Sequence, residues 1–150
     1  MKYASGTCGR IFYLHIEHGE DPIRTITGFI REHGVHAGVI NLIGAVRNTR
    51  LVTGPKEDLL PHEPRWEEVP DAHELVGIGI IRSGAEGPAV HIHMSAGRGD
   101  TVLTGCIRGN AEAFIIVEAV ITEFSGIELP LVPDALTRMD LPDPKSQSPV

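Results

Sequence analysis

Hydrophobic and polar residues alternate along residues 10–17, Arg-Ile-Phe-Tyr-Leu-His-Ile-Glu, and this alternation is typical of a β-strand. A helix is predicted directly after the turn at residues 18–20, because Asp21 can cap its start and Pro22 suits its first position. Apolar residues then recur at helical spacing, at Ile23, Ile26, Phe29 and Ile30. Gly34 is expected to end the helix.

Two further strands are predicted over residues 35–45 and 46–53, where β-branched residues dominate. Residues 54–71 carry four prolines and many charges, which exclude a central strand or a long helix. We expect a loop or an edge excursion there, with Trp66 on it. A lone tryptophan in such a segment more often covers a core than binds a ligand. Residues 74–82 predict the next strand.

Residues 111–124 are ambiguous, because Ala and Glu favour helix whereas Ile and Val favour strand, and we predict a strand. One helix and seven or so strands joined by short turns indicate an α+β fold, a largely antiparallel β-sheet packed with one main helix. Residues 115–121 are apolar on both faces, so the sheet face without the helix needs cover. A partner subunit would supply it, and an oligomer is predicted.

The chain of 150 residues fits one domain, and a polar tail with two prolines begins at Asp143. Cys8 and Cys106 form no disulfide framework, and the N-terminus lacks the pattern of a signal peptide. A cytoplasmic protein is therefore predicted. The longest apolar run, residues 113–121, is too short to cross a bilayer, so no membrane partner is expected.

The formal net charge is -7, from 13 basic and 20 acidic residues. Binding to nucleic-acid phosphates needs clustered Lys and Arg, and the sequence does not cluster them, so DNA binding is disfavoured. Arg47 and Arg50 come nearest to a patch, although an ordinary solvated turn explains them better. A basic stripe on an assembled surface, with Arg24 and Arg31 as further members, stays open.

The chemically most informative residues are His91 and His93 in Ala-Val-His-Ile-His-Met. On an extended strand two residues at this spacing lie on one face, about 6.5 Å apart along it, so both rings can reach one metal ion. Cys106 could be the third ligand. A hairpin loop at Gly99-Asp100 places residue 106 opposite residue 93, and a loop at Arg98-Gly99 places it opposite residue 91. A three-residue loop would turn the thiol to the other face.

A set of His91, His93 and Cys106 suits zinc in a tetrahedral site whose fourth position is open to water or substrate. The alternative is that the histidines are polar residues on a half-buried strand and Cys106 is a small apolar core residue. Catalysis at such a site would also need a general base. Glu118 is a weak catalytic candidate, Glu20 and His15 are weaker, and a structural role is at least as plausible for each. His33, His36, His62 or His73 could add a fourth ligand across a subunit interface.

Four stretches make the chain similar to the plants-and-prokaryotes conserved domain, the PPC domain. They are residues 19–21, residues 34–51 with Ile-Gly-Ala-Val at 43–46, Glu74-Leu75, and His91-Ile92-His93 with Gly105-Cys106. Leu129-Pro130-Leu131 also fits. The resemblance covers residues 10–142 and predicts a PPC-like domain at 1–142 with a flexible C-terminal tail at 143–150. The chain differs from many bacterial members of the family at Cys106, where they carry His.

The resemblance implies a homotrimer whose free-standing prokaryotic members sometimes carry metal. It also implies a predicted DNA-binding label, which comes from plant relatives with an Arg-Gly-Arg-Pro hook that this chain lacks. Three functions are therefore considered. The first is a trimeric metal protein with an open zinc site, binding or acting on a small molecule as a hydrolase or lyase would. The second is a DNA-associated or regulatory trimerisation module. The third is a scaffold without chemistry.

Overall fold

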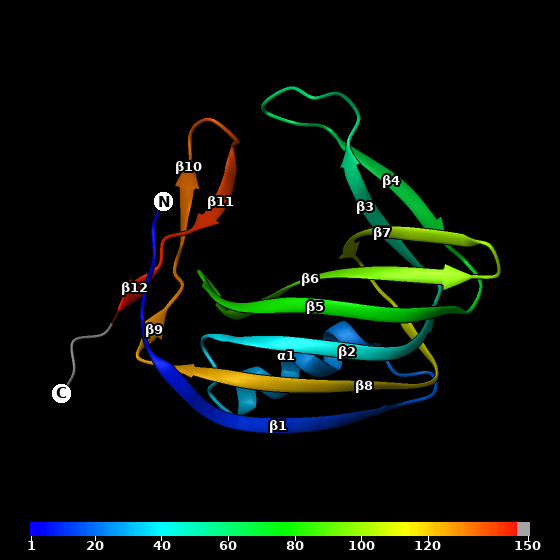
Figure 1. The fold of residues 1–150 in the computed structure, drawn as a ribbon, viewed down its shortest axis with the longest axis horizontal. Coiled ribbons are helices and arrows are strands. Elements are labelled where there is room, and N and C mark those ends of the chain that lie inside the picture. Colours follow the sequence, from blue (N-terminus) through cyan, green and yellow to red (C-terminus); the bar gives the residue numbers. More distant parts are fainter. Residues whose placement is uncertain (147–150) are drawn as a thin grey trace.

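A computed structural model describes residues 1–146 as a large antiparallel sheet with one helix on one face (Figure 1). The helix α1 spans Pro22–Glu32. The strands of the main sheet are β1 (Thr7–Glu17), β2 (Gly38–Arg47), β3 (Thr49–Pro55), β4 (Pro64–Val69), β5 (His73–Gly84), β6 (Gly87–Arg98), β7 (Thr101–Arg108) and β8 (Glu112–Ser125). Their order across the sheet is β1-β8-β2-β5-β6-β7-β3-β4, and all neighbours are antiparallel. The predicted α+β class is confirmed.

The helix begins and ends where the sequence predicts. The Asp21 side chain accepts hydrogen bonds from the backbone N–H groups of Ile23 and Arg24, at 2.9 and 3.1 Å, as an N-cap residue does. Gly34 follows the helix with φ of +63°, the left-handed conformation that glycine adopts at helix ends. The amphipathic face of α1 then packs across β6 and β8.

The core lies between α1 and the sheet. Ile26 and Ile30 of the helix are fully buried against Ile40 of β2, Ile81 of β5 and Val117 of β8. Residues at every second position of the strands contribute to this core, because side chains alternate between the faces of a sheet. Residues 112–125 form one strand, as predicted, because β8 pairs on both sides, with β1 and β2, where helical geometry is impossible.

Two boundaries differ in detail from the predictions. The first two strands after the helix separate at Asn48, which has φ of +53°, rather than at residues 45 and 46. Within residues 54–71, the predicted edge excursion contains β4, which pairs with β3 alone and ends the sheet. Trp66 on β4 is exposed, and the Cζ atom of Arg50 lies 4.3 Å from the centre of its ring. Trp66 therefore does not cover the core.

Four short strands follow β8 and were not predicted from the sequence. They are β9 (Ile127–Glu128), β10 (Leu131–Asp134), β11 (Met139–Pro142) and β12 (Lys145–Ser146), paired as β10 with β11 and β9 with β12. Asp143 also forms an ion pair with Lys2. Residues 143–146 of the predicted tail are thus held by other segments, whereas residues 147–150 lie outside the described residues. The division into a domain at 1–142 and a flexible tail stays a prediction.

Within residues 1–146, no other element covers the sheet face opposite α1 over β1, β8, β2 and β5. Side chains that share this face form rows across the strands, because directly opposed residues point the same way. One row runs through Tyr13, Val120, Asn41, Ile78 and His93. Several members of this face are large, apolar and exposed, including Ile11, Ile43 and Val76. Among the described residues, no helix is long and apolar enough to cross a membrane.

Candidate metal centre

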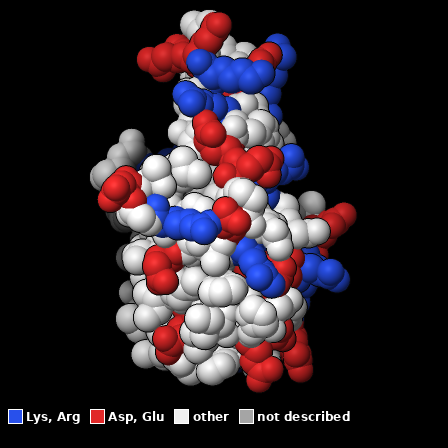
Figure 2. Space-filling model, turned by 90° about the vertical axis from the view of Figure 1, so that its right-hand side faces the viewer, with Lys and Arg blue, Asp and Glu red and all other residues white. Residues whose placement is uncertain are grey.

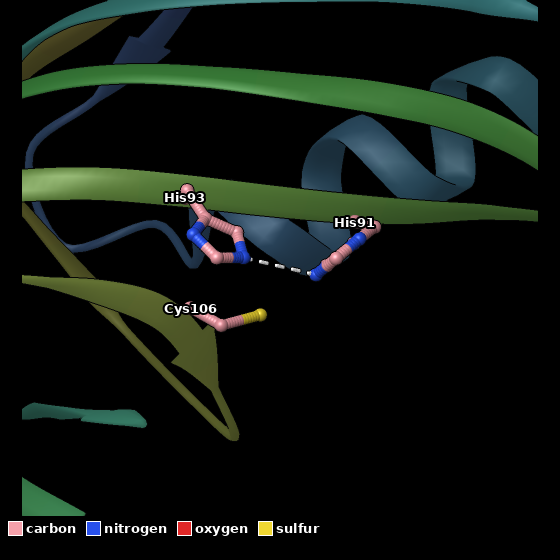
Figure 3. A group of neighbouring side chains, drawn as sticks. All are labelled: His91, His93 and Cys106. Atoms are coloured by element: carbon pink, nitrogen blue, oxygen red, sulfur yellow. Dashed lines mark hydrogen bonds between the residues drawn. The ribbon is translucent and has the colours of Figure 1, made fainter. Parts of the chain in front are cut away.

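The structure brings His91, His93 and Cys106 together at one point of the uncovered face (Figure 3). Both histidines project from β6 on the same side, and Cys106 projects toward them from β7. The hairpin loop is Gly99-Asp100, so His93 lies directly opposite Cys106. Gly99 has φ of +58°, at the loop position where type II′ turns favour glycine. The first of the three registers considered from the sequence is therefore the one that forms.

The three potential ligand atoms lie within 4.8 Å of one another. The Nε2 atoms of the two histidines are 3.2 Å apart, and their rings are nearly perpendicular, with centres 4.9 Å apart. One ring therefore donates a hydrogen bond to the other in the absence of a metal ion. Cys106 is buried, His91 is half-buried and His93 is exposed, so the group is open on one side.

A cavity of about 350 Å³ opens beside these side chains. Its walls come from the end of β3, from β6 and β7, from the loop before β4 and from β11. The lining residues are Val52, Thr53, Gly54, Pro55, His62, His91, His93, Thr104, Gly105, Cys106, Arg108 and Met139. A small molecule that entered the cavity would meet the imidazoles and the thiol on one wall.

The surroundings keep the His91 ring neutral. Its pKa falls to about 4, first because burial disfavours the charged ring and then because the positive charges of Arg82, His93 and Arg108 are near. A neutral imidazole has a free lone pair at neutral pH, which metal ligation requires. The same burial raises the pKa of the Cys106 thiol, although Arg108 and Arg82 oppose the rise. Without a metal ion, Cys106 is therefore a thiol, and binding would release its proton.

The three candidate general bases do not meet the cluster. Glu118 projects from β8, three strands away from β6, which corresponds to about 14 Å at the usual strand spacing. It accepts a 2.5 Å hydrogen bond from the Tyr13 hydroxyl. His15 lies opposite Glu118 on β1, one strand further away. Glu20 accepts a hydrogen bond from the backbone of Glu17 at the start of the helix. Within one chain, none of these residues can serve the cluster.

The cavity also contains His62, which the sequence offered only as a ligand across a subunit interface, and Arg108, which the sequence analysis did not consider. His62 lines it from the loop before β4, in the same chain rather than across an interface. Arg108 lines it from β7, two residues after Cys106 and thus on the same face. The alternation of β7 could have revealed Arg108. Nothing in the sequence indicated that the loop with His62 folds over this site.

The four arginines considered from the sequence do not gather on one surface of the described chain. Arg47 pairs with Glu112, and Arg31 donates to the Pro88 carbonyl oxygen. Arg24 lies on α1, on the opposite side of the sheet from Arg50 on β3. On the face in Figure 2, acidic and basic side chains are interspersed. A basic stripe on an assembled surface stays a prediction.

The Plants and Prokaryotes Conserved (PCC) domain, named PPC above, matches residues 3–125. A metal-containing protein from Archaeoglobus fulgidus is 29% identical, with a TM-score of 0.84 over 94% of this chain and 98% of that one. A PPC protein from Pyrococcus horikoshii is 21% identical, with a TM-score of 0.80 over 94% and 96%. A candidate DNA-binding protein from Bacteroides thetaiotaomicron is 20% identical, with a TM-score of 0.73 over 92% and 96%. No curated protein matches the chain.

Proposed function

Because the chain belongs to the Plants and Prokaryotes Conserved domain family, we propose that it is a homotrimeric metal protein of that family. In this proposal His91, His93 and Cys106 bind zinc and leave a fourth position open to a small molecule. The convergence of the three ligand atoms carries the proposal.

The spacing of the three ligand atoms fits a zinc ion. In a tetrahedral site with Zn–N near 2.0 Å and Zn–S near 2.3 Å, the two nitrogens are separated by about 3.3 Å and each nitrogen from the sulfur by about 3.5 Å. The two Nε2 atoms already lie 3.2 Å apart, and all three atoms lie within 4.8 Å. Small side-chain rotations would therefore close the site. Two imidazoles and one thiolate also match the nitrogen and sulfur ligands that zinc prefers.

The Archaeoglobus relative supports the presence of a metal, because it is described as metal-containing and shares 29% of its residues with this chain. Zinc held by His91, His93 and Cys106 would supply Lewis-acid chemistry at the open position. The protein side chains have separate tasks. His91 stays neutral and offers a lone pair, Cys106 gives up its proton when the ion binds, and the cavity walls limit the size of what can enter.

The uncovered apolar face supports self-association. Ile11 is 70% exposed, Val76 68% and Ile78 56%, and all three lie on the sheet face opposite α1. An apolar surface of this kind marks an interaction site in a monomer, and closed symmetry is the usual arrangement for copies of one chain. A homotrimer would bury this face while the metal cluster stays at its border.

Elemental analysis tests the metal part of the proposal. Protein purified without added metal is compared as wild type, His93→Ala and Cys106→Ala, with His18→Ala as a control because His18 is exposed and outside the cavity. We expect one zinc per chain in the wild type and in the control, and strongly reduced zinc in both cluster variants. Equal metal in all four proteins, or none in any, would contradict the proposal.

Sedimentation equilibrium tests the trimer separately. We expect three times the chain mass of 16.2 kDa. The DNA-binding alternative has less support, because the Bacteroides relative is only 20% identical and the net charge is -7. Duplex DNA binding that weakens steeply with salt would favour that alternative over a small-molecule role.

A further inference from the structure

Two arginines stand beside the metal cluster without a role in the proposed metal site. Arg108 follows Cys106 by two residues on β7 and lines the cavity. Arg108 and His91 line the same cavity, and each lies two residues from the His93–Cys106 pair on the face that carries the cluster. Arg82 follows Ile80 by two residues on β5, and Ile80 lies opposite His91. Both arginines therefore reach the same region from the two strands that flank β6.

The geometry of the strands brings both arginines to the cluster. Arg108 lines the cavity wall that also holds His91, His93 and Cys106. Arg82 is not among the residues that line the cavity, but it lies on the same face of the sheet as His91, on the neighbouring strand β5, because side chains alternate along a strand.

Neither arginine has a counter-charge among the described residues. The ion pairs in that part of the chain involve Lys2, Arg10, Arg47, Lys56, Arg65 and Arg98. The Nε–H group of Arg82 is buried and has no hydrogen-bond acceptor. Arg108 lies directly opposite Arg50 on β3, and opposed like charges destabilise a sheet. The site therefore has donors and positive charge in excess and lacks an acceptor.

A planar or tetrahedral oxyanion would supply both the missing negative charge and the missing hydrogen-bond acceptor. The guanidinium group offers parallel N–H donors whose geometry matches a carboxylate or a phosphate. The cavity volume of about 350 Å³ is within the range of small-molecule sites. No carboxylate is among the described residues that line the cavity, so an anion that entered would not be repelled there.

We propose that the cavity binds a small molecule through a carboxylate or phosphate group, which Arg82 and Arg108 hold beside the His91, His93 and Cys106 cluster. The position of this group next to the open metal coordination site rests on the function proposed above. The arginine contact itself does not, because the positions of both arginines follow from the strand register and the cavity lining. The substrate class of the site is accordingly a small organic anion.

Isothermal titration calorimetry tests this inference with two probes, sodium phosphate and sodium acetate, at an ionic strength held constant with sodium chloride. Metal-free and zinc-loaded protein are titrated as wild type, Arg82→Gln, Arg108→Gln and Arg24→Gln. Arg24 is an exposed arginine on α1, on the other side of the sheet, so its variant changes the net charge equally. The two probes distinguish a phosphate site from a carboxylate site.

We expect at least one probe to bind the wild type and Arg24→Gln equally. Arg82→Gln and Arg108→Gln should each bind that probe at least tenfold more weakly. Arg108→Lys should recover only part of the affinity, because lysine keeps the charge and loses the two-pronged donor geometry. The zinc content should be unchanged in all of these variants.

The outcomes separate this inference from the metal proposal. Stoichiometric zinc together with equal anion binding in all variants would overturn the arginine site and leave the metal proposal standing. Arginine-dependent anion binding to a protein that takes up no zinc would support the anion site and overturn the metal proposal. A third outcome is that no probe binds the wild type and that Arg82→Gln and Arg108→Gln dissociate the oligomer. The arginines would then pair with a neighbouring subunit, and the inference would be wrong.

Discussion

The two halves of the uncovered sheet face have the same backbone geometry and opposite surface chemistry. Over β1, β8, β2 and β5, the outward positions carry apolar side chains such as Tyr13, Ile43 and Ile78, which are exposed. Over β6 and β7, the same register positions carry His91, His93 and Cys106. One continuous face of the sheet therefore presents an apolar surface over four of its strands and a group of potential metal ligands over the next two.

The halves also differ in the hollows that they border, since the hollow of about 300 Å³ over β2 and β5 has Val76 and Ile78 in its wall. Beside the histidines, the end of β3, the loop with His62 and Met139 of β11 form a cavity. A flat apolar surface is stabilised by another flat surface, whereas a hollow with polar groups can enclose a small molecule. We therefore propose association for the first half and ligand binding for the second.

The largest expected effect removes the chemistry of the second half. His93→Ala or Cys106→Ala should lower zinc affinity at least about 100-fold, because loss of a direct ligand costs more than loss of an outer-sphere partner. Titration against a chromophoric chelator measures this affinity. The same variants should keep the oligomeric state of the wild type, and dissociation on loss of metal would show that the two halves depend on each other.

The next effect breaks the first half and leaves the second intact. Ile78→Asp places a charge in the middle of the apolar surface, and we expect a mass of 16.2 kDa where the wild type is a trimer. The substitution should weaken the free energy of association by about 2 kcal/mol or more at each subunit interface. Leu136→Asp is the control, because Leu136 is exposed in the turn between β10 and β11. Analytical ultracentrifugation measures both, and a trimer that persists in Ile78→Asp would contradict the assignment of this face.

A smaller effect concerns the backbone that supports the ligand half. A Cβ atom at Gly105 would lie 2.4 Å from the backbone oxygen of Val52, so β7 and β3 could not keep their separation. We expect Gly105→Ala to lower the free energy of unfolding by about 1 to 3 kcal/mol. Urea denaturation measures this change. Gly99→Ala at the hairpin loop has open space but a φ of +58°, so comparison of the two separates steric overlap from backbone strain.

The smallest effect is a pH dependence of the metal-free protein. The pKa of His91 is about 4 in the folded chain and about 6.5 when unfolded, so the unfolded state takes up its proton first as the pH falls. Stability should therefore decrease from pH 6.5 toward pH 4, by about 1 kcal/mol at pH 5 after allowance for solvent screening. Urea midpoints at pH 7 and pH 5 measure it, and His91→Gln should lose the component that His91 contributes.

The sequence predicted the group of potential metal ligands but not the shape of the cavity beside it. The spacing of His91 and His93 placed both rings on one face, and the choice among three hairpin loops decided whether Cys106 joined them. The structure selects Gly99-Asp100. Glu118 was chosen because it interrupts an apolar run, but a run along one strand says nothing about distance across the sheet. The order of the strands places it far from the cluster.

Local pattern thus determined the helix after Asp21, most of the strands and the pairing of the two histidines, because these depend on side-chain periodicity and on contacts a few residues apart. Only the tertiary structure decided which strands are neighbours and which loops fold over the face. The cavity with His62, and the meeting of Arg82 and Arg108 beside His91, depend on those long-range contacts. A sequence defines the face of each residue on its strand, and the strand order defines which residues share a site.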